Sequence, residues 1–379
     1  MEPSDLVGMA LIRVLGPVEA LRVAAGEVRT GTALERQIAA QLDEAGASSS
    51  WQGLAPALSR WGTRLPDLAP KRDLDVIRRL GGGLLTPEDQ EWPEALADLG
   101  LGEPIALWVR SPHRQLPPLS QSVAVVGSRD STSYGAGVTA EMAHGLAQRG
   151  FTVVSGGAYG IDAHAHRAAL AGSRGALATI AVMAGGVDRF YPAGNEELLR
   201  TIAEQGAMIA EVPPGSNPTR YRFLQRNRLI AALCAVTVVV EARWRSGALS
   251  TAHHADVLSR NVAAVPGSVY SANSAGCHRL LREGSAVCVT DAAEVAELAG
   301  ASGDHLAAEM SGPNADHDGL NLEDLLLLDA LPVVAASTAE KLCTVAGLSL
   351  QTVLSGLGRL ELLGLAERSN GNWRRRKRP

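Results

Sequence analysis

Short apolar segments alternate with helical segments from Val123 to Thr290, and this alternation constrains the fold more than any other feature. Strands that are apolar on both faces are typical of parallel sheets covered by helices on both sides. The sequence therefore predicts an α/β fold, an extended Rossmann-like, doubly wound parallel sheet. The predicted strands are 123–127, 151–157, 176–186, 207–212, 235–242, 261–267 and 286–290, with one more at 105–109. The predicted helices are 134–149, 161–171, 196–205, 223–233, 247–258 and 275–282, with another after 290.

The segments on either side of this domain predict two smaller ones. Residues 1–68 have helical spacing and predict a helical domain, which leaves 69–298 as the α/β core. Residues 299–321 are small and polar, as in a linker. Residues 322–379 predict three helices and a hairpin turning at Asn370-Gly371, which is typical of a winged helix-turn-helix domain.

Several classes of protein are disfavoured by the sequence. No apolar run is long enough to span a bilayer, and residues 1–8 lack the basic and apolar regions of a signal peptide. We therefore expect a cytoplasmic protein without a membrane partner. The four cysteines lack the CxxC spacing of a zinc site, and Asp162, His164 and His166 do not share one helix face. We expect no metal and no cofactor.

Glycine-rich loops follow the first two strands of the core. In open α/β sheets, ligands bind beyond the carboxyl ends of strands, where backbone N–H groups face outward. These loops predict an anion site in which Arg129 pairs with a phosphate and Asp162 fixes the second loop. Each loop alone is also compatible with a tight turn packed on its neighbour. The candidate residues are Gly127, Ser128 and Arg129, then Ser155, Gly156, Gly157, Gly160 and Asp162.

The densest basic segment of the core is TRYRFLQRNRLIAAL at 219–233. Cations at a helix N-terminus oppose the helix dipole, and a phosphate backbone lying across that end would account for them. Aromatic rings in the same turn are suited to stacking on bases. An amphipathic helix with solvated arginines is the alternative. The candidates are Arg222, Phe223, Arg226, Asn227 and Arg228, and Ser246 and Gly247 of a later strand-end loop.

The charge distribution favours a local site over attraction by the whole surface. The chain carries a net charge of −5. Residues 121–290 nevertheless hold 15 Arg and no Lys against 11 Asp plus Glu, a net of +4. A locally basic core in an acidic protein is typical of a defined nucleic-acid groove.

Seven motifs, in this order and spacing, resemble the DprA/Smf family of DNA-processing proteins. The match extends over about 85–298. It implies a homodimer that binds single-stranded DNA and hands it to the RecA recombinase during natural transformation. The motifs are GSR (127–129), SGGAYGIDAHAH (155–166), DRFYPAGN (188–195), RFLQRNRLIA (222–231), RSGALSTA (245–252), AVPG (264–267) and SAGCHRLLREGSAV (274–287).

The resemblance also assigns roles by position. It implies that Gly127, Ser128 and Arg129 hold a phosphate and that Gly156, Gly157, Gly160 and Asp162 form the pocket loop. It places Arg226, Asn227 and Arg228 along the strand path. The flanking segments resemble the SAM-like domain and the winged helix of longer members.

Two other functions stay open. One is a Rossmann-fold enzyme that hydrolyses nucleotides, but apart from Asp162 no acidic residue adjoins SGGAYG, and no GxxxxGK[ST] loop is present. Without a nucleophile–base pair we expect a protein that is not an enzyme and has no catalytic residues. The other is a regulator that reads duplex DNA through the winged helix and uses the core as a ligand sensor.

Overall fold

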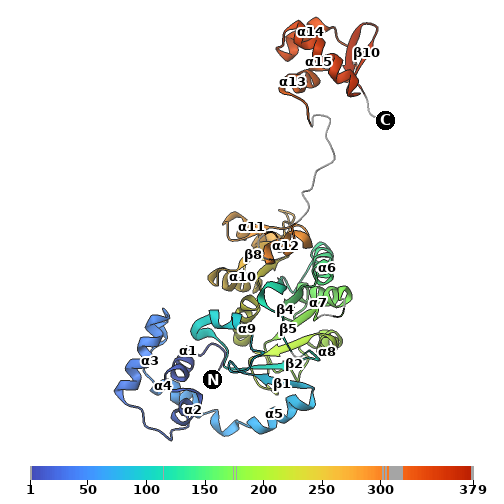
Figure 1. Cartoon of the computed structure of the whole chain (residues 1–379). Coiled ribbons are helices and arrows are strands. Elements are labelled where there is room, and N and C mark those ends of the chain that lie inside the picture. The colour runs from blue at the N-terminus through green and yellow to red at the C-terminus, as the bar shows by residue number, and fades with distance from the viewer. Residues whose placement is uncertain are drawn as a thin grey trace. The chain divides into compact units, whose positions relative to one another are not determined.

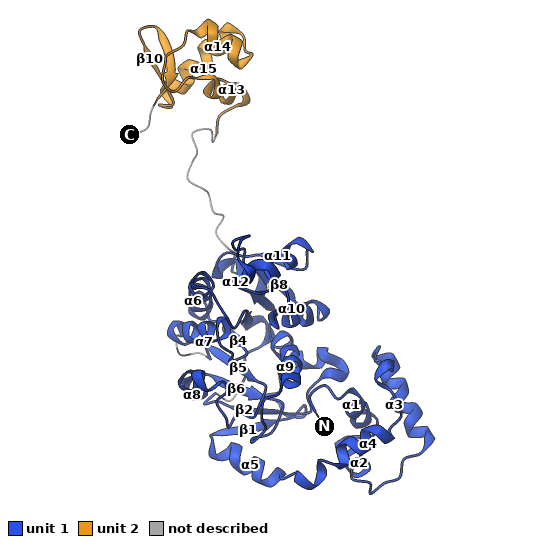
Figure 2. Cartoon of the chain, turned by 180° about the vertical axis from the view of Figure 1, so that it is seen from behind, with its two compact units in different colours: residues 1–307 blue, residues 308–379 orange. Residues whose placement is uncertain are grey.

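The computed structural model describes residues 2–113, 115–173, 175, 177–300, 303, 305–306 and 319–376. The chain forms two compact units, residues 1–307 and 308–379 (Figures 1 and 2). The predicted helical domain and the α/β core therefore pack together in the first unit. Much of the predicted linker at 299–321 lies outside the described residues.

A nine-stranded sheet in the order β1-β2-β6-β5-β4-β3-β7-β8-β9 forms the centre of the first unit. The seven strands from β6 to β9 in this order pair in parallel, and β1 and β2 add an antiparallel edge. The predicted, mostly parallel α/β sheet is confirmed. Strand β1 was not predicted, because the glycines at 81–83 have low strand propensity. The strands are β1 (Gly82–Leu85), β2 (Leu107–Arg110), β3 (Ser122–Val126), β4 (Thr152–Ser155), β5 (Thr179–Met183), β6 (Ala207–Ala210), β7 (Val236–Val239), β8 (Asn261–Ala264) and β9 (Val287–Cys288).

Helices cover both faces of this sheet, as Figure 1 shows. Successive residues of a strand point to opposite faces, so Val123 and Val125 pack in one apolar layer and Ala124 and Val126 in the other. One face carries α5 (Pro70–Arg79), α6 (Ser133–Gln148), α7 (Ile161–Gly172), α8 (Glu196–Gln205) and α12 (Ala292–Ala299). The other carries α9 (Arg220–Ala232), α10 (Ala248–Val257) and α11 (Ala275–Arg282).

Four helices before the sheet form a small bundle of their own. They pack around a cluster that includes the fully buried Ile38, Leu42 and Leu54. Leu101, in a 3₁₀ segment at Glu94–Gly102 of the core, joins the same cluster and ties the bundle to the sheet. Its resemblance to a SAM-like domain stays a prediction. The helices are α1 (Leu6–Leu15), α2 (Pro17–Ala24), α3 (Thr32–Glu44) and α4 (Ala55–Gly62).

The second unit contains the three predicted helices and the predicted hairpin. Ser349 caps the third helix by accepting a hydrogen bond from Thr352 N at 3.2 Å. Asn370 and Gly371 both have positive φ, which suits the tight turn between the two strands. That this unit is a winged helix-turn-helix stays a prediction. Its elements are α13 (Leu322–Ala330), α14 (Ala339–Ala346), α15 (Leu350–Leu362), β10 (Ala366–Ser369) and β11 (Asn372–Arg375).

The structure also bears on membranes and metals. Within the described ranges, no helix combines the length and the apolar character that a bilayer crossing requires. The same ranges contain no group of three or more His, Cys, Asp or Glu side chains arranged to hold a metal ion.

Candidate nucleic-acid interface

A cavity of about 370 Å³ lies beyond the carboxyl ends of β3 and β7. The order of the sheet reverses at these two strands, because β4 lies on one side of β3 and β7 on the other. Crevices at such a reversal are the usual ligand sites of open α/β sheets. The cavity is lined by residues of the segments 126–130, 158–162, 223–230 and 243–251.

The loop after β3 is held closely against the end of β7. Ser128 N donates to Glu241 O at 2.7 Å, and a Cβ on Gly127 would lie 2.5 Å from Ile161 Cγ1. The Ser128 hydroxyl is buried and lies 3.3 Å from both the N and the O of Asp130. Gly127 and Ser128 therefore line the cavity while their geometry fixes the loop that presents Arg129.

The loop after β4 approaches the first loop within van der Waals contact. Gly157 and Gly160 have positive φ of 67° and 73°, which favours glycine. A Cβ on Gly160 would lie 2.2 Å from Ser128 O, so only glycine fits between the two loops. Ser155 Oγ donates to Val125 O at 2.7 Å and anchors the loop to β3. These residues shape the loop, and Asp162 is the candidate from it that lines the cavity.

Arg226 places a buried positive charge in the cavity wall. Its Nη1 donates to Gly156 O at 2.7 Å and also to Val182 O, and its side chain lies so close to Gly156 that a Cβ there would clash. Its Nε has no hydrogen-bond partner among the described residues. Burial lowers the pKa of Arg226 to about 10, and the Asp162 carboxylate opposes this shift. The guanidinium therefore stays charged at neutral pH.

Asp162 is the buried carboxyl group of the same wall. Its Oδ2 accepts a hydrogen bond from Ala158 N at 3.3 Å. Burial raises its pKa, and the charge of Arg226 acts in the opposite direction. Both interactions fit the prediction that Asp162 fixes the loop.

An aromatic ring close to two arginines lines the same cavity. The Arg129 guanidinium carbon lies 5.0 Å from the centre of the Phe223 ring, and that of Arg226 lies 5.9 Å from it. Arg129 and Arg245 are exposed, and neither is in an ion pair within the described part of the chain. The cavity thus combines a stackable ring with cations that are available to phosphates.

Ser246, Gly247 and Asn227 complete the floor of the cavity. Asn227 Nδ2 donates to Gly247 O at 3.2 Å and joins α9 to the loop before α10. Arg243 and Arg245 line the cavity but were not predicted. The signal was present in the sequence, because Arg243 directly follows the apolar strand at 235–242 and Arg245 begins the motif RSGALSTA.

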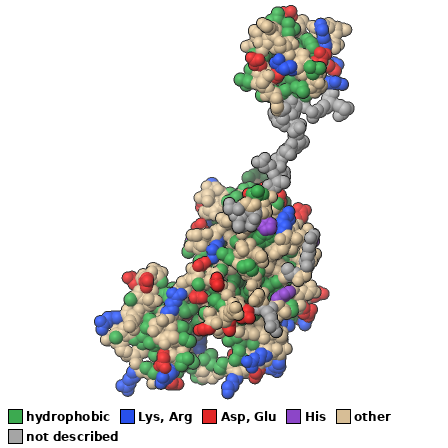
Figure 3. All heavy atoms as spheres, in the orientation of Figure 1, with side chains coloured by type: hydrophobic (Ala, Val, Ile, Leu, Met, Phe, Trp, Pro, Cys, Tyr) green, Lys and Arg blue, Asp and Glu red, His purple; other side chains and the backbone are tan. Residues whose placement is uncertain are grey.

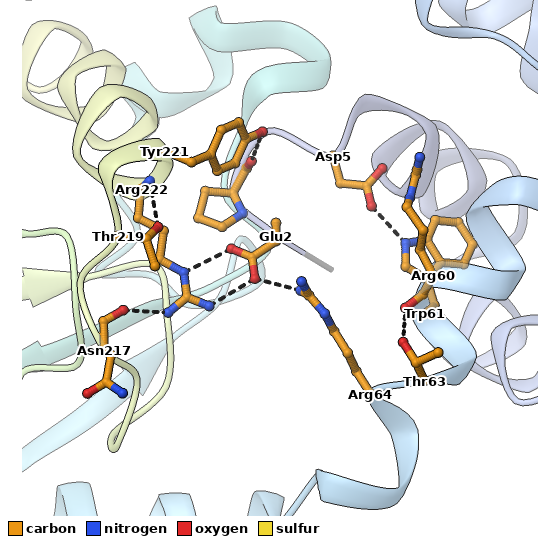
Figure 4. Close-up of polar contacts among 11 residues, drawn as sticks. Glu2, Asp5, Arg60, Trp61, Thr63, Arg64, Asn217, Thr219, Tyr221 and Arg222 are labelled. Atoms are coloured by element: carbon orange, nitrogen blue, oxygen red, sulfur yellow. Dashed lines mark hydrogen bonds and ion pairs between the residues drawn. The ribbon is translucent and has the colours of Figure 1, made fainter.

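Two predicted residues of α9 lie outside the cavity. Arg228 forms a bidentate ion pair with Glu211, with distances of 2.7 and 2.8 Å, and its Nε donates to Gly102 O at 2.9 Å. Arg222 forms a bidentate pair with Glu2, both distances being 2.9 Å (Figure 4). The structure therefore brings Phe223, Arg226 and Asn227 to the cavity and engages Arg222 and Arg228 elsewhere.

Comparisons with known proteins show which family the chain belongs to. The sequence model of the family described as DNA recombination-mediator protein A matches residues 83–300. A Mycobacterium tuberculosis protein that carries the DprA name is 43% identical over 384 residues, covering 98% of this chain and 91% of the relative. The chain belongs to the DprA family. The predicted resemblance is confirmed, and the family model covers nearly the segment that the motifs indicated.

Two solved DprA structures share the fold. DprA from Streptococcus pneumoniae superposes with a TM-score of 0.58 at 30% identity, covering 77% of this chain and 93% of that protein. DprA from Helicobacter pylori superposes with a TM-score of 0.50 at 28% identity, covering 56% of this chain and 94% of that protein. The structure of the H. pylori protein describes its single-stranded DNA binding mode. Membership of the DprA family assigns this chain to DNA processing.

Proposed function

We propose that this protein binds single-stranded DNA in the cavity beyond β3 and β7 and hands the strand to the RecA recombinase during natural transformation or recombination. One observation carries the proposal: the guanidinium carbons of Arg129 and Arg226 lie 5.0 and 5.9 Å from the centre of the Phe223 ring, in a cavity at the reversal point of the sheet. Cations neutralise the phosphate backbone, and the ring offers a surface on which a base stacks.

Several features favour a single strand over a duplex. Stacking on Phe223 requires an unpaired base that leaves its neighbours, which a duplex does not offer. Four arginines line this one cavity: Arg129, Arg226, Arg243 and Arg245. On the face shown in Figure 3, basic and acidic side chains are interspersed. The H. pylori relative, which binds single-stranded DNA, supports the same preference for a single strand.

The carboxylates of the site support binding over hydrolysis. Asp162 is buried beside Arg226 and accepts from Ala158 N, while Asp130 pairs with Arg243. Glu241, at the end of β7, accepts from Thr132 Oγ1 at 2.6 Å and from Thr132 N at 2.9 Å. Each carboxylate therefore has a structural partner, and a base that activates water is not evident in the described site. We propose that the protein is not an enzyme.

The remaining parts of the proposal follow the family resemblance. We propose that the working protein is a homodimer and that residues 322–379 form a winged helix-turn-helix domain joined to the core by the linker at 299–321. The three helices and the hairpin of the second unit support the second point. Residues 1–68 are proposed as the SAM-like domain.

Binding to a fluorescent oligo-dT and to a duplex of the same length, over a series of salt concentrations, tests the proposal. We expect tighter binding of the single strand and a log–log salt slope of about −0.7 per phosphate contacted. Arg129→Ala is expected to weaken binding and flatten the slope by roughly one contact. Arg149→Ala is the matched control, since this arginine is exposed at the end of α6 and bonds only to Gly145 O in the described contacts.

Binding of duplex DNA that does not depend on Arg129 would assign the DNA-binding site elsewhere. Duplex binding as tight as that of the single strand, with Arg129→Ala no weaker than Arg149→Ala, would overturn the assignment of the cavity. The second unit would then be the DNA-binding part, as the duplex-reading regulator requires.

A further inference from the structure

We propose that the first unit holds a second phosphate-binding site for single-stranded DNA, between α4 and the start of α9, which the Glu2 carboxylate occupies in this structure. This inference rests on the proposed function, because it extends the path of the same strand. The site is a cavity of about 420 Å³ separate from the first, and its walls include Arg60, Arg64 and Tyr221.

The Glu2 carboxylate lies where a phosphate would be held. It accepts from Arg222 Nε and Nη2 at 2.9 Å each and from Arg64 Nη1 at 2.6 Å (Figure 4). Arginines from two separate elements thus converge on one oxyanion. Guanidinium groups bind carboxylate and phosphate with the same fork of N–H donors. The geometry that holds Glu2 is therefore also suited to a phosphodiester.

Residues on one turn of α9 line both the second cavity and the first. Tyr221 lines the second cavity and Leu224 lines the first, and residues three apart on a helix are neighbours on its surface. Both side chains are exposed, Tyr221 at 47% and Leu224 at 46%. A strand that leaves the cavity at Phe223 therefore reaches the second one by crossing this turn.

Two acidic side chains of the second cavity, Asp5 and Glu2, differ in their hydrogen-bond partners. Asp5 caps α1 by accepting from Gly8 N at 3.2 Å, and it accepts from Trp61 Nε1 at 2.7 Å. It is part of the fold and stays in place. The side chain of Glu2, in contrast, has only the two arginines as partners among the described contacts. The hydrogen bonds from Arg222 hold its pKa below the usual range, so it is ionised and competes directly with a phosphate.

Displacing Glu2 would expose both charge and aromatic surface. Arg60 is exposed and is in no ion pair within the described residues. Arg64 and Arg222 would hold a phosphate at the vacated position, and Arg60 would add a third cation elsewhere on the cavity wall. Tyr221 Oη donates to Pro3 O at 3.1 Å, so release of residues 2 and 3 also frees this ring for stacking. Only a strand long enough to reach beyond the first cavity gains these contacts.

The test compares a short and a long oligo-dT on the full chain by fluorescence anisotropy. A length of about 6 nucleotides lies near the lower end of the site sizes of single-strand binding modules, and about 20 exceeds the upper end. Glu2→Gln is expected to raise the affinity for the long oligonucleotide by about threefold or more, which is the effect of roughly one exposed charge. The affinity for the short oligonucleotide is expected to change by less than about twofold. Arg60→Ala is expected to lower the affinity for the long oligonucleotide by about threefold and to reduce the log–log salt slope of its binding by about 0.7.

The controls separate this site from the first cavity. Arg36→Ala, on the exposed face of α3, removes an equal charge elsewhere in the helical bundle. It is expected to leave the affinity for both oligonucleotides unchanged. Equal responses of the long and short oligonucleotides to Glu2→Gln would overturn the second site, as would an Arg60→Ala variant indistinguishable from Arg36→Ala. Short oligo-dT that binds without dependence on Arg129 would instead overturn the proposed function itself.

Discussion

Arginines lie on both sides of α9, but those of the two sides have different partners. On one side, Phe223 and Arg226 face the cavity at the switch point of the sheet. On the other, Arg222 and Arg228 reach Glu2 and Glu211 in bidentate ion pairs. The difference lies in the surroundings: Arg226 is buried beside Asp162 in the cavity wall, where the exposed Arg129 and Arg245 are in no ion pair among the described residues. Arg129 and Arg245 are therefore available to a phosphate as they stand, whereas Arg222 would bind one only after Glu2 is displaced.

Removing Arg226 gives the largest expected effect. Arg226→Met leaves the carbonyl groups of Gly156 and Val182 without their donor, and it leaves the buried Asp162 without a compensating charge. We expect a loss of about 3–5 kcal/mol in the free energy of unfolding, together with loss of oligo-dT binding. Urea denaturation measures the first and anisotropy the second. An Arg226→Met protein as stable as wild type would show that the buried charge is dispensable.

Removing Arg228 is expected to lower the stability of the protein without changing its affinity for DNA. Arg228→Met breaks the pair with Glu211 and the bond to Gly102 O, at a cost of about 3 kcal/mol in unfolding free energy. The double variant Arg228→Met/Glu211→Leu is expected to recover part of this loss, because no charge is left unpaired. Oligo-dT affinity of the folded variants should match wild type. Weaker binding in proportion to Arg129→Ala would mean that Arg228 also contacts the strand.

The buried groups beneath Arg226 predict a pH dependence. Thr179 Oγ1 donates to Val153 O, so His166 Nδ1 is the donor to Thr179 and its Nε2 carries a buried lone pair. Burial and the charge of Arg226 lower the pKa of His166 to about 3. The unfolded state therefore binds more protons below pH 6.5, and stability should fall as pH drops from 6.5 towards 3, by about 2 kcal/mol at pH 5.

His166→Asn supplies the matched control for this pH dependence. The amide retains a donor towards Thr179 but does not titrate. Urea denaturation at pH 7 and pH 5 should show a smaller difference for the variant than for wild type. Identical pH profiles would show that His166 does not exchange a proton on unfolding.

The sheet and the cavity loops were predictable because they depend on local patterns. Apolar strands such as 123–127 and 235–242 are followed by glycine or polar turns, and the parallel order brings their carboxyl ends to one edge. Arg129, Asp162 and Phe223 could be placed at that edge from their positions alone. The glycine at 160 was predicted as a loop residue, and the structure adds its close contact with Ser128 O.

The partners of the arginines could not be predicted in the same way. Glu2 lies 220 residues from Arg222 in the sequence, and Gly102 lies 126 residues from Arg228. Such pairings depend on how the helical bundle and the 3₁₀ segment pack against the core, which no local pattern encodes. Strand β1 was missed for a related reason, because its glycines form a strand only through pairing with β2.

The most direct test of the central claim is ultraviolet crosslinking of oligo-dT to the full protein, followed by mass spectrometry of the crosslinked peptides. The account predicts crosslinks at Phe223, in the cavity beyond β3 and β7, that disappear with excess unlabelled oligo-dT and weaken in Arg129→Ala. Crosslinks confined to residues 319–376, with none in 123–290, would contradict it.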